Sequence, residues 1–173
     1  DIHKRCKPAT ASNRYRPLQR YFRWLVEEGE IKESPMAKMH PPKVLEQLAP
    51  VVSDDAITKL LKACCGADFE DRRDLAVIRL FLGTGSRRSE LANLTLQDVD
   101  LDGQTLTVVG KGHWPRIVPY GRKAARDLDR YLRVRAQHRD KDAPALWLGK
   151  AGLMTDSGIA QIVRDRAVKA GIG

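Results

Sequence analysis

The chain has 173 residues, of which 42% are hydrophobic and 31% are charged, as in an ordinary soluble globular protein of one domain or slightly more. Its apolar runs are short and interrupted by charges, which excludes a membrane-spanning helix. Residues 1–9 lack the apolar core of a secretory signal, and the sequence does not start with methionine. We therefore expect it to begin inside a longer protein.

The net charge of +9 is unevenly distributed, being +4 over residues 1–50, −2 over residues 51–100 and +7 over residues 101–173. Two basic ends around a near-neutral middle are typical of a protein that contacts a polyanion from two sides. A basic surface that only faces solvent has the same composition, so charge alone leaves both interpretations open.

The cysteines Cys6, Cys64 and Cys65 argue against a disulfide framework, because their number is odd and two of them are adjacent. No spacing of cysteine and histidine matches a zinc site. We therefore expect reduced thiols in a reducing compartment, and neither a metal nor another cofactor.

Residues 12–28 are predicted to form a helix with an apolar and a basic face. Its apolar side chains recur at intervals of three and four: Leu18, Tyr21, Phe22 and Leu25. The other face is expected to carry four arginines: Arg14, Arg16, Arg20 and Arg23. Pro17 fits the first turn if Ser12 or Asn13 is the N-cap.

The next stretch, residues 31–50, contains four prolines, a density that no helix or central strand tolerates. We expect an extended basic linker carrying Lys38 and Lys43, with a domain boundary at about residue 50. The predicted domains are therefore residues 1–50 and residues 51–173.

The second domain is predicted to begin with a helix capped by Ser53. A helix over residues 72–82 is apolar over most of its surface, which places it at the centre of the core. Gly83 and Gly85 are expected to end it, and a short helix follows over residues 89–94.

The pattern then changes to period two over residues 98–121, which predicts two or three short antiparallel strands. A long helix over residues 122–137, an extended piece at residues 145–149 and a last helix capped by Thr155 or Asp156 follow. The predicted fold class is mainly α with a small antiparallel sheet (α+β).

Residues 83–91, GTGSRRSEL, place two arginines directly after the Gly-x-Gly break. They match neither a P-loop nor a Rossmann turn, which needs a preceding strand and a glycine where Arg88 stands. Glu90 lies three residues after Arg87, so its carboxylate can fix a guanidinium that matches two phosphate oxygens. The alternative is a surface ion pair worth about 0–1 kcal/mol.

Lys111 is the second candidate, because it lies between two glycines at a predicted hairpin tip. A flexible lysine in that position can contact a phosphate or act as a general acid. A solvated turn lysine is the alternative.

Together these residues resemble the tyrosine recombinase family, which includes phage integrases and Xer-type enzymes. Residues 84–91 match its first box, T-G-x-R-x-S-E-L, while residues 110–112, GKG, and residues 116–119, RIVP, match the hairpin that follows. Residues 10–36 are similar to the end of the family's core-binding domain, and residues 154–173 to the helix before its second box.

The chain departs from the family pattern after the GKG motif. Tyr120 stands where an aliphatic residue is usual, and Trp114 with Pro115 occupies a turn usually built from small or polar residues. Neither departure falls on a residue of the expected chemistry.

The resemblance implies a tyrosine-recombinase-like catalytic domain preceded by the end of a helical core-binding domain. It also implies that a tyrosine attacks a DNA phosphodiester, forming a 3′-phosphotyrosine and freeing a 5′-hydroxyl without a metal. Arg87 would stabilise charge on the non-bridging oxygens, Glu90 would support Arg87, and Lys111 would protonate the leaving oxygen.

The implied partners are double-stranded DNA and further copies of the protein, as a tetramer on two duplexes, in the cytoplasm at the nucleoid. The expected DNA contacts set affinity and salt dependence and carry no sequence information. They are Arg14, Arg16, Arg20, Arg23, Lys38, Lys43, Arg88 and Arg116. A solvated basic face remains the alternative for each of them.

The family's second box, with His-x-x-Arg and the nucleophilic tyrosine, is absent from the chain. None of the tyrosines present stands at the nucleophile's position: Tyr15, Tyr21, Tyr120 and Tyr131. We therefore expect a fragment that binds DNA and cannot cleave it alone. The alternative is a non-catalytic DNA-binding regulator with a recombinase-like fold.

Overall fold

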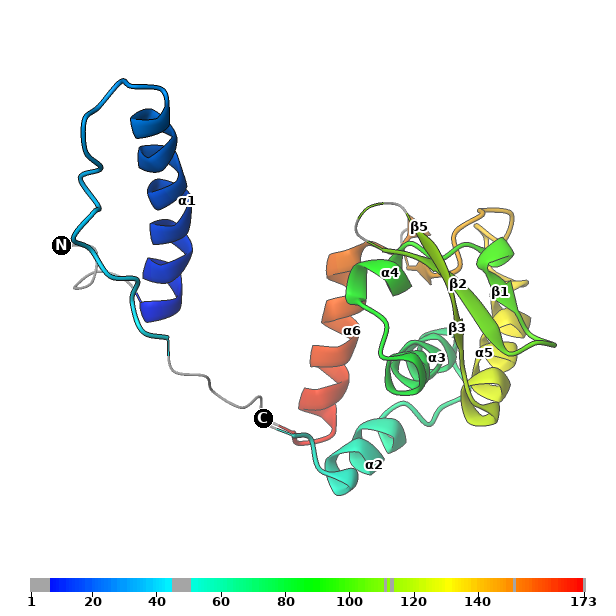
Figure 1. Cartoon of the computed structure of the whole chain (residues 1–173). Helices are drawn as coiled ribbons and strands as arrows, with labels where there is room; N and C mark the ends of the chain where they lie inside the picture. Colours follow the sequence, from blue (N-terminus) through cyan, green and yellow to red (C-terminus); the bar gives the residue numbers. More distant parts are fainter. Residues whose placement is uncertain (1–6, 45–50, 111, 113, 151, 173) are drawn as a thin grey trace. The chain divides into compact units, whose positions relative to one another are not determined.

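The structure is a computed structural model that describes residues 7–44, 51–110, 112, 114–150 and 152–172. The chain divides into two compact units, Asp1–Val51 and Val52–Gly173 (Figure 1). The first is built on one long helix, and the second combines helices with short antiparallel strands. This is the predicted mainly α fold with a small sheet.

The long helix of the first unit, α1, spans Pro8–Glu27 and begins earlier than predicted. Pro8 favours this start, because the first helical position needs no N–H donor. Pro17 consequently lies inside the helix and removes one backbone hydrogen bond. No helix signal was predicted in the added first turn of α1. Tyr15, one turn further along the helix, is buried and donates its hydroxyl to the Met39 carbonyl at 2.8 Å.

The two faces of α1 differ from the expectation. Leu18 and Tyr21, which belong to the predicted apolar face, are exposed in the described structure. Three arginines share one face of the helix: Arg16, Arg20 and Arg23. At about 100° per residue, Arg14 instead falls on the side of Leu18. The basic face of α1 therefore holds three of the four predicted arginines.

The segment after α1 has no helix or strand in its described part, residues 28–44. Gly29, with φ of 76°, takes the left-handed conformation that ends the helix. Lys38 and Lys43 are exposed, as expected for this segment. Residues 45–50 lie outside the described residues.

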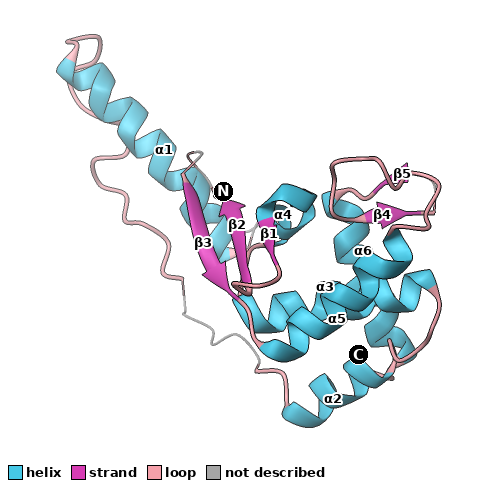
Figure 2. Cartoon of the chain, turned by 90° about the vertical axis from the view of Figure 1, so that its right-hand side faces the viewer, coloured by secondary structure: helices cyan, strands magenta, loops and turns pink. Residues whose placement is uncertain are grey.

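Helix α3, Phe69–Thr84, is the central helix of the second unit, as the sequence predicts. Its buried apolar side chains are Leu75, Ala76, Val77, Ile78 and Leu80. It packs mainly against α5, Arg122–Arg135, which lies alongside it (Figures 1 and 2). Leu82, one of the apolar residues from which this core position was predicted, is exposed and lines a pocket with side chains of α2 and α6.

The remaining two long elements are α2, Asp54–Lys62, and α6, Asp156–Lys169. Ser53 caps α2 as predicted, since its Oγ accepts a hydrogen bond from the Ala56 N–H at 3.2 Å. Thr155, and not Asp156, caps α6.

A buried ionic cluster joins α2, α3 and α6. Arg166 donates to Asp71 at 2.7 Å, to Asp74 at 2.8 Å and to the Ala63 carbonyl at 2.9 Å. Arg73 donates to the other oxygen of Asp74 at 2.8 Å. Buried charges are tolerated when they are paired and hydrogen-bonded in this way. No sequence pattern predicted the cluster.

The period-two region forms a three-stranded antiparallel sheet in the order β1-β2-β3 (Figure 2). The strands are β1, Val99–Asp100, β2, Thr105–Val109, and β3, Pro115–Pro119. Leu106 and Val108 of β2 face the core. The prolines at the two ends of β3 fit an edge strand, where a missing N–H costs little.

Four short elements complete the described part of the unit. Helix α4, Arg88–Ala92, and the 3-10 turn η2, Leu96–Asp98, connect α3 to the sheet. Strands β4, Leu148–Gly149, and β5, Gly152–Leu153, form a second, two-stranded antiparallel sheet before α6. Among the described residues, no helix is long and apolar enough to cross a membrane.

The ionic cluster can be tested by replacing Gly66 with alanine. A Cβ at this position would overlap the Asp71 carboxylate, so Asp71 must shift, and we expect the shift to weaken its bond to Arg166. We expect Gly66→Ala to lower the free energy of unfolding by about 1–3 kcal/mol, measured by urea denaturation.

Gly83→Ala is the matched control, because a Cβ there meets nothing within 4 Å and alanine is the better helix former. It should be neutral or slightly stabilising. Equal free energies of unfolding in the two variants would contradict a stabilising contribution from the bond between Asp71 and Arg166.

Candidate functional site

Arg87 stands at the N-cap of α4, directly after α3 ends. Gly85 turns the chain between the two helices with φ of 60°, a conformation that favours glycine. Gly83, which was also expected to end α3, lies within its last turn. The turn leaves the Arg87 side chain 71% exposed.

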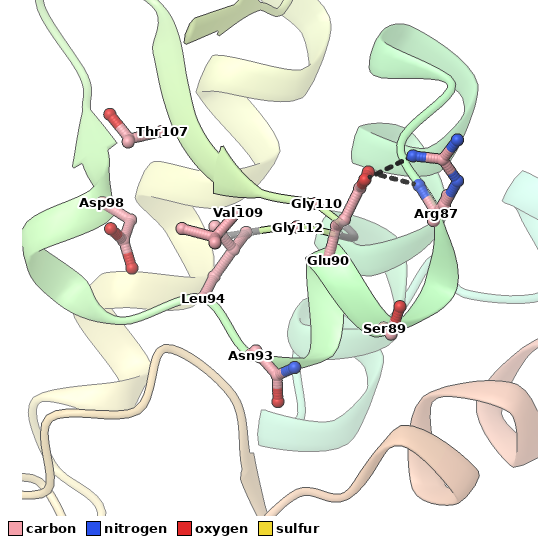
Figure 3. A pocket seen from close by; sticks show the side chains of 10 residues that line it. All are labelled: Arg87, Ser89, Glu90, Asn93, Leu94, Asp98, Thr107, Val109, Gly110 and Gly112. Atoms are coloured by element: carbon pink, nitrogen blue, oxygen red, sulfur yellow. Dashed lines mark hydrogen bonds and ion pairs between the residues drawn. The ribbon is translucent and has the colours of Figure 1, made fainter. Parts of the chain in front are cut away.

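Glu90 is the centre of the site, because its side chain is only 2% exposed and lies between two arginines. Its carboxylate accepts the Arg87 backbone N–H at 2.9 Å and Arg87 Nη1 at 2.9 Å (Figure 3). Arg116 of β3 donates through Nη1 at 2.9 Å and Nη2 at 2.7 Å, one to each oxygen. The predicted contact between Arg87 and Glu90 is therefore present.

The second arginine was not foreseen in this position, since Arg116 was predicted only as a DNA contact. It lies 26 residues after Glu90, and the pairing of β3 with β2 brings it back to α4. The motif R-x-V-P marked Arg116 as a residue of interest but gave no partner for it.

These bonds lower the pKa of Glu90 from 4.5 to about 2, and the hydrogen bonds from Arg116 are the largest cause. Burial acts in the opposite direction, and the Arg87 bonds add to the lowering. The same contact raises the pKa of Arg116. Because the folded pKa lies below the unfolded value, this contribution to stability is complete above about pH 4.5 and is lost toward pH 2.

The hairpin between β2 and β3 approaches the carboxylate closely at Gly110. A Cβ at this position would lie 3.3 Å from both Glu90 Oε1 and Arg116 Nη1. A glycine therefore allows the hairpin to reach the site. Lys111 lies outside the described residues, and its role stays a prediction.

The site opens on a cleft of about 710 Å³ between α4 and the sheet (Figure 3). Arg87 and Glu90 line it together with Asn93 and Thr107, which the sequence did not single out. Asp98 also lines it, but its carboxylate is engaged by the N–H and hydroxyl of Thr95, both at 2.7 Å. The described lining of the cleft therefore combines the exposed Arg87 guanidinium with two carboxylates, those of Glu90 and Asp98, and with neutral polar groups.

Helix α4 has five residues and depends on its surroundings for its position, because so short a helix is unstable alone. Trp147 is fully buried, stacks on Tyr131 and donates its indole N–H to the Leu91 carbonyl at 2.8 Å. The Leu146 N–H donates to the Leu94 carbonyl at 2.8 Å. The segment ALWLG, predicted only as an extended piece, therefore fixes the helix that carries Glu90.

The other predicted DNA contacts are not gathered in this cleft. Arg88 does not line it, and instead donates to Asp156 at the start of α6 at 2.7 Å. The remaining candidates are exposed residues of the first unit: Arg14, Arg16, Arg20, Arg23, Lys38 and Lys43. Their DNA contacts stay predictions.

None of the tyrosines, all of which are described, lines the cleft. Tyr120 donates its hydroxyl to the Asp100 carbonyl at 2.9 Å, and burial raises its pKa to about 12. Burial also raises the pKa of Tyr131. A nucleophile is activated by an adjacent base or by a lowered pKa, and burial shifts both of these pKa values upward. Within the described part of the chain, no group of three His, Cys, Asp or Glu side chains could hold a metal ion.

The Glu90 contacts predict a measurable titration. In carbon-detected NMR, the Glu90 carboxyl should titrate at about pH 2, and Arg116→Ala should raise its pKa more than Arg87→Ala does. Arg87→Ala keeps the backbone N–H that donates to Glu90, which explains the smaller expected effect. A pKa near 4.5 in the unmodified chain would show that the carboxylate is not held as described.

Comparison with known proteins identifies the family to which this fold and this site belong. The model of the phage integrase family matches residues 50–173. The tyrosine recombinase XerC of Azotobacter vinelandii is 36% identical over 153 residues, covering 88% of this chain and 51% of the relative. XerC of Thermodesulfovibrio yellowstonii is 33% identical over 169 residues, covering 94% and 56%. The chain thus spans about half the length of these relatives.

Solved structures show the same fold. The XerA recombinase is 29% identical, with a TM-score of 0.64 over 79% of this chain and 47% of that chain. Lambda integrase (residues 75–356) bound to DNA is 16% identical, with a TM-score of 0.74 over 98% of this chain and 60% of that chain. The chain therefore belongs to the phage integrase family, and its relatives are tyrosine recombinases.

Proposed function

We propose that this chain is part of a site-specific DNA recombinase and that its second unit binds a phosphodiester of the DNA backbone at Arg87. The observation that carries the proposal is the buried Glu90 carboxylate held between Arg87 and Arg116. The two guanidinium groups around the Glu90 carboxylate make this cluster net positive, which suits a monoanionic phosphodiester, although the Asp98 carboxylate lines the same cleft.

The hydrogen bonds support Arg87 as the group that contacts the phosphate. Within the described residues, Glu90 engages only Nη1 of its guanidinium, so Nε and Nη2 remain to donate. Both terminal nitrogens of Arg116 are engaged by Glu90. Arg116 keeps further N–H donors, but Arg87 lines the cleft and Arg116 does not. Arg87 is then the ligand-facing group, and Arg116 holds the carboxylate that fixes it.

In the complete recombinase, a tyrosine outside this chain would attack the phosphodiester and form a 3′-phosphotyrosine. Negative charge then builds on the non-bridging oxygens, where a fixed guanidinium stabilises it without moving. Loss of one such donor typically costs about 10²–10³ in rate. Lys111 would protonate the leaving 5′-oxygen.

The remaining parts of the proposal follow the relatives. Residues 1–50 would be the end of a core-binding domain, whose basic residues contact the backbone, and residues 51–173 the first part of a catalytic domain. One neighbouring structure is a lambda integrase tetramer on a Holliday junction, and another is XerH bound to its difH substrate. The proposed partners are therefore duplex DNA and further copies of the protein, in the cytoplasm at the nucleoid.

A non-catalytic DNA-binding regulator remains the second candidate, because no described tyrosine lines the cleft. A nicked suicide substrate separates the two when the protein is made from its complete reading frame. A covalent protein–DNA adduct identifies the recombinase, whereas binding without an adduct identifies the regulator. The present chain should bind DNA and form no adduct.

The phosphate contact is tested by titrating a 30-base-pair duplex with the chain at several salt concentrations. Binding should weaken steeply with salt, because phosphate contacts release counterions. Arg87→Ala should weaken it by about tenfold at moderate salt, as expected for one charge-assisted hydrogen-bonding group.

Arg133→Ala is the control, since it removes the same charge from an exposed ion pair with Asp129 on α5. It should have little effect. Equal losses in the two variants would mean that net charge alone governs binding. Salt-insensitive binding would contradict the phosphate contact altogether.

A further inference from the structure

Trp114 is a large apolar side chain that the fold does not use. It lies directly before β3 and is 82% exposed. Exposed single apolar residues are common, but on this hairpin Val109 and Ile117 are exposed as well. The side chain contributes almost nothing to the core, so packing does not explain why a tryptophan stands there.

The position of Trp114 connects it with the arginine site. Its indole Cδ1 lies 3.4 Å from the point that a Cβ on Gly112 would occupy. Gly112 and Val109 line the same cleft as Arg87 and Glu90. The indole therefore lies beside the rim of the cleft, at the hairpin end that is closest to the guanidinium groups.

We propose that Trp114 is a base-stacking site, which accepts a nucleobase next to the phosphodiester bound at Arg87. The inference rests on the proposed function, since a bound phosphodiester carries a nucleoside on either side. An exposed aromatic ring beside cationic groups is the combination that binds unstacked nucleic acid. The guanidinium groups of Arg87 and Arg116 near this hairpin favour DNA over an apolar protein surface as the occupant.

Stacking on Trp114 requires a base that has left the base stack, because a base inside a duplex has a stacked neighbour on each face. The cost of exposing a base is lowest where it is already unpaired or mismatched. The chain should therefore bind DNA with a local interruption more tightly than an intact duplex. Cutting and rejoining of strands passes through such interruptions, which gives the site a use in the proposed reaction.

The experiment compares two 30-base-pair DNAs of equal length and charge, one fully paired and one with a two-nucleotide mismatched bubble at its centre. The unmodified chain should prefer the bubble. Trp114→Ala should lose at least about fivefold in affinity for the bubble, the lower end of the effect of one stacked base. Trp114→Phe should retain most of the affinity, because its ring still stacks.

Two features distinguish stacking from a charge effect or a folding defect. The slope of log affinity against log salt should stay unchanged in Trp114→Ala, because no phosphate contact is lost. Thermal unfolding should also stay unchanged, since the side chain is exposed. Trp24→Ala, which removes another exposed tryptophan from α1, should leave the bubble preference intact.

The outcomes separate the inference from the proposed function. If the unmodified chain binds neither DNA, the proposed function fails. If the unmodified chain binds both DNAs, and Trp114→Ala binds each of them with the same affinity as the unmodified chain, DNA binding stands and the stacking site is wrong. Loss of self-association in Trp114→Ala, with DNA affinity unchanged, would overturn the inference in favour of a contact between copies.

Discussion

The arrangement of the second unit around the cleft depends on one buried carboxylate. Glu90 takes four hydrogen bonds from Arg87 and Arg116, and these lower its pKa to about 2. A buried charge without such partners would be strongly destabilising. The contact therefore joins α4 to the edge strand β3, and the same contact fixes an exposed guanidinium. Stability and the proposed recognition of phosphate have a common origin here.

The Glu90 carboxylate is held in place by the contacts of the helix that carries it. Helix α4 is too short to define its own position, and Trp147 anchors it through the Leu91 carbonyl. Arg135, at the end of α5, donates to four backbone carbonyls of the loop that leads to Trp147: Lys141, Ala143, Ala145 and Leu146. Arg135 is buried, so this arginine serves the fold, while Arg87 remains open to a ligand. Exposure and partners, more than residue type, separate structural arginines from candidate binding ones.

Local signals in the sequence were sufficient for most of the long elements and for the contact between Arg87 and Glu90. The cap at Ser53, the apolar helix α3 and the contact between Arg87 and Glu90 all depend on residues a few positions apart. The contacts that were missed join distant positions, such as Arg166 with Asp74 across 92 residues and Trp147 with Leu91 across 56. The predicted start of α1 and the predicted place of Arg14 on its basic face were also wrong. Helical periodicity indicates an amphipathic helix but does not show what covers its apolar face.

The central claim is that Glu90 acts by bracing a phosphate-binding arginine, and the DNA affinity of Glu90→Gln tests it most directly. The loss of a negative charge and the loss of the brace on Arg87 change the DNA affinity in opposite directions. Removing a negative charge beside a polyanion should strengthen binding if only net charge matters. If Glu90 holds Arg87 in position, the variant should bind the duplex more weakly than the unmodified chain, despite its extra positive charge. Tighter binding by a correctly folded Glu90→Gln would contradict the account.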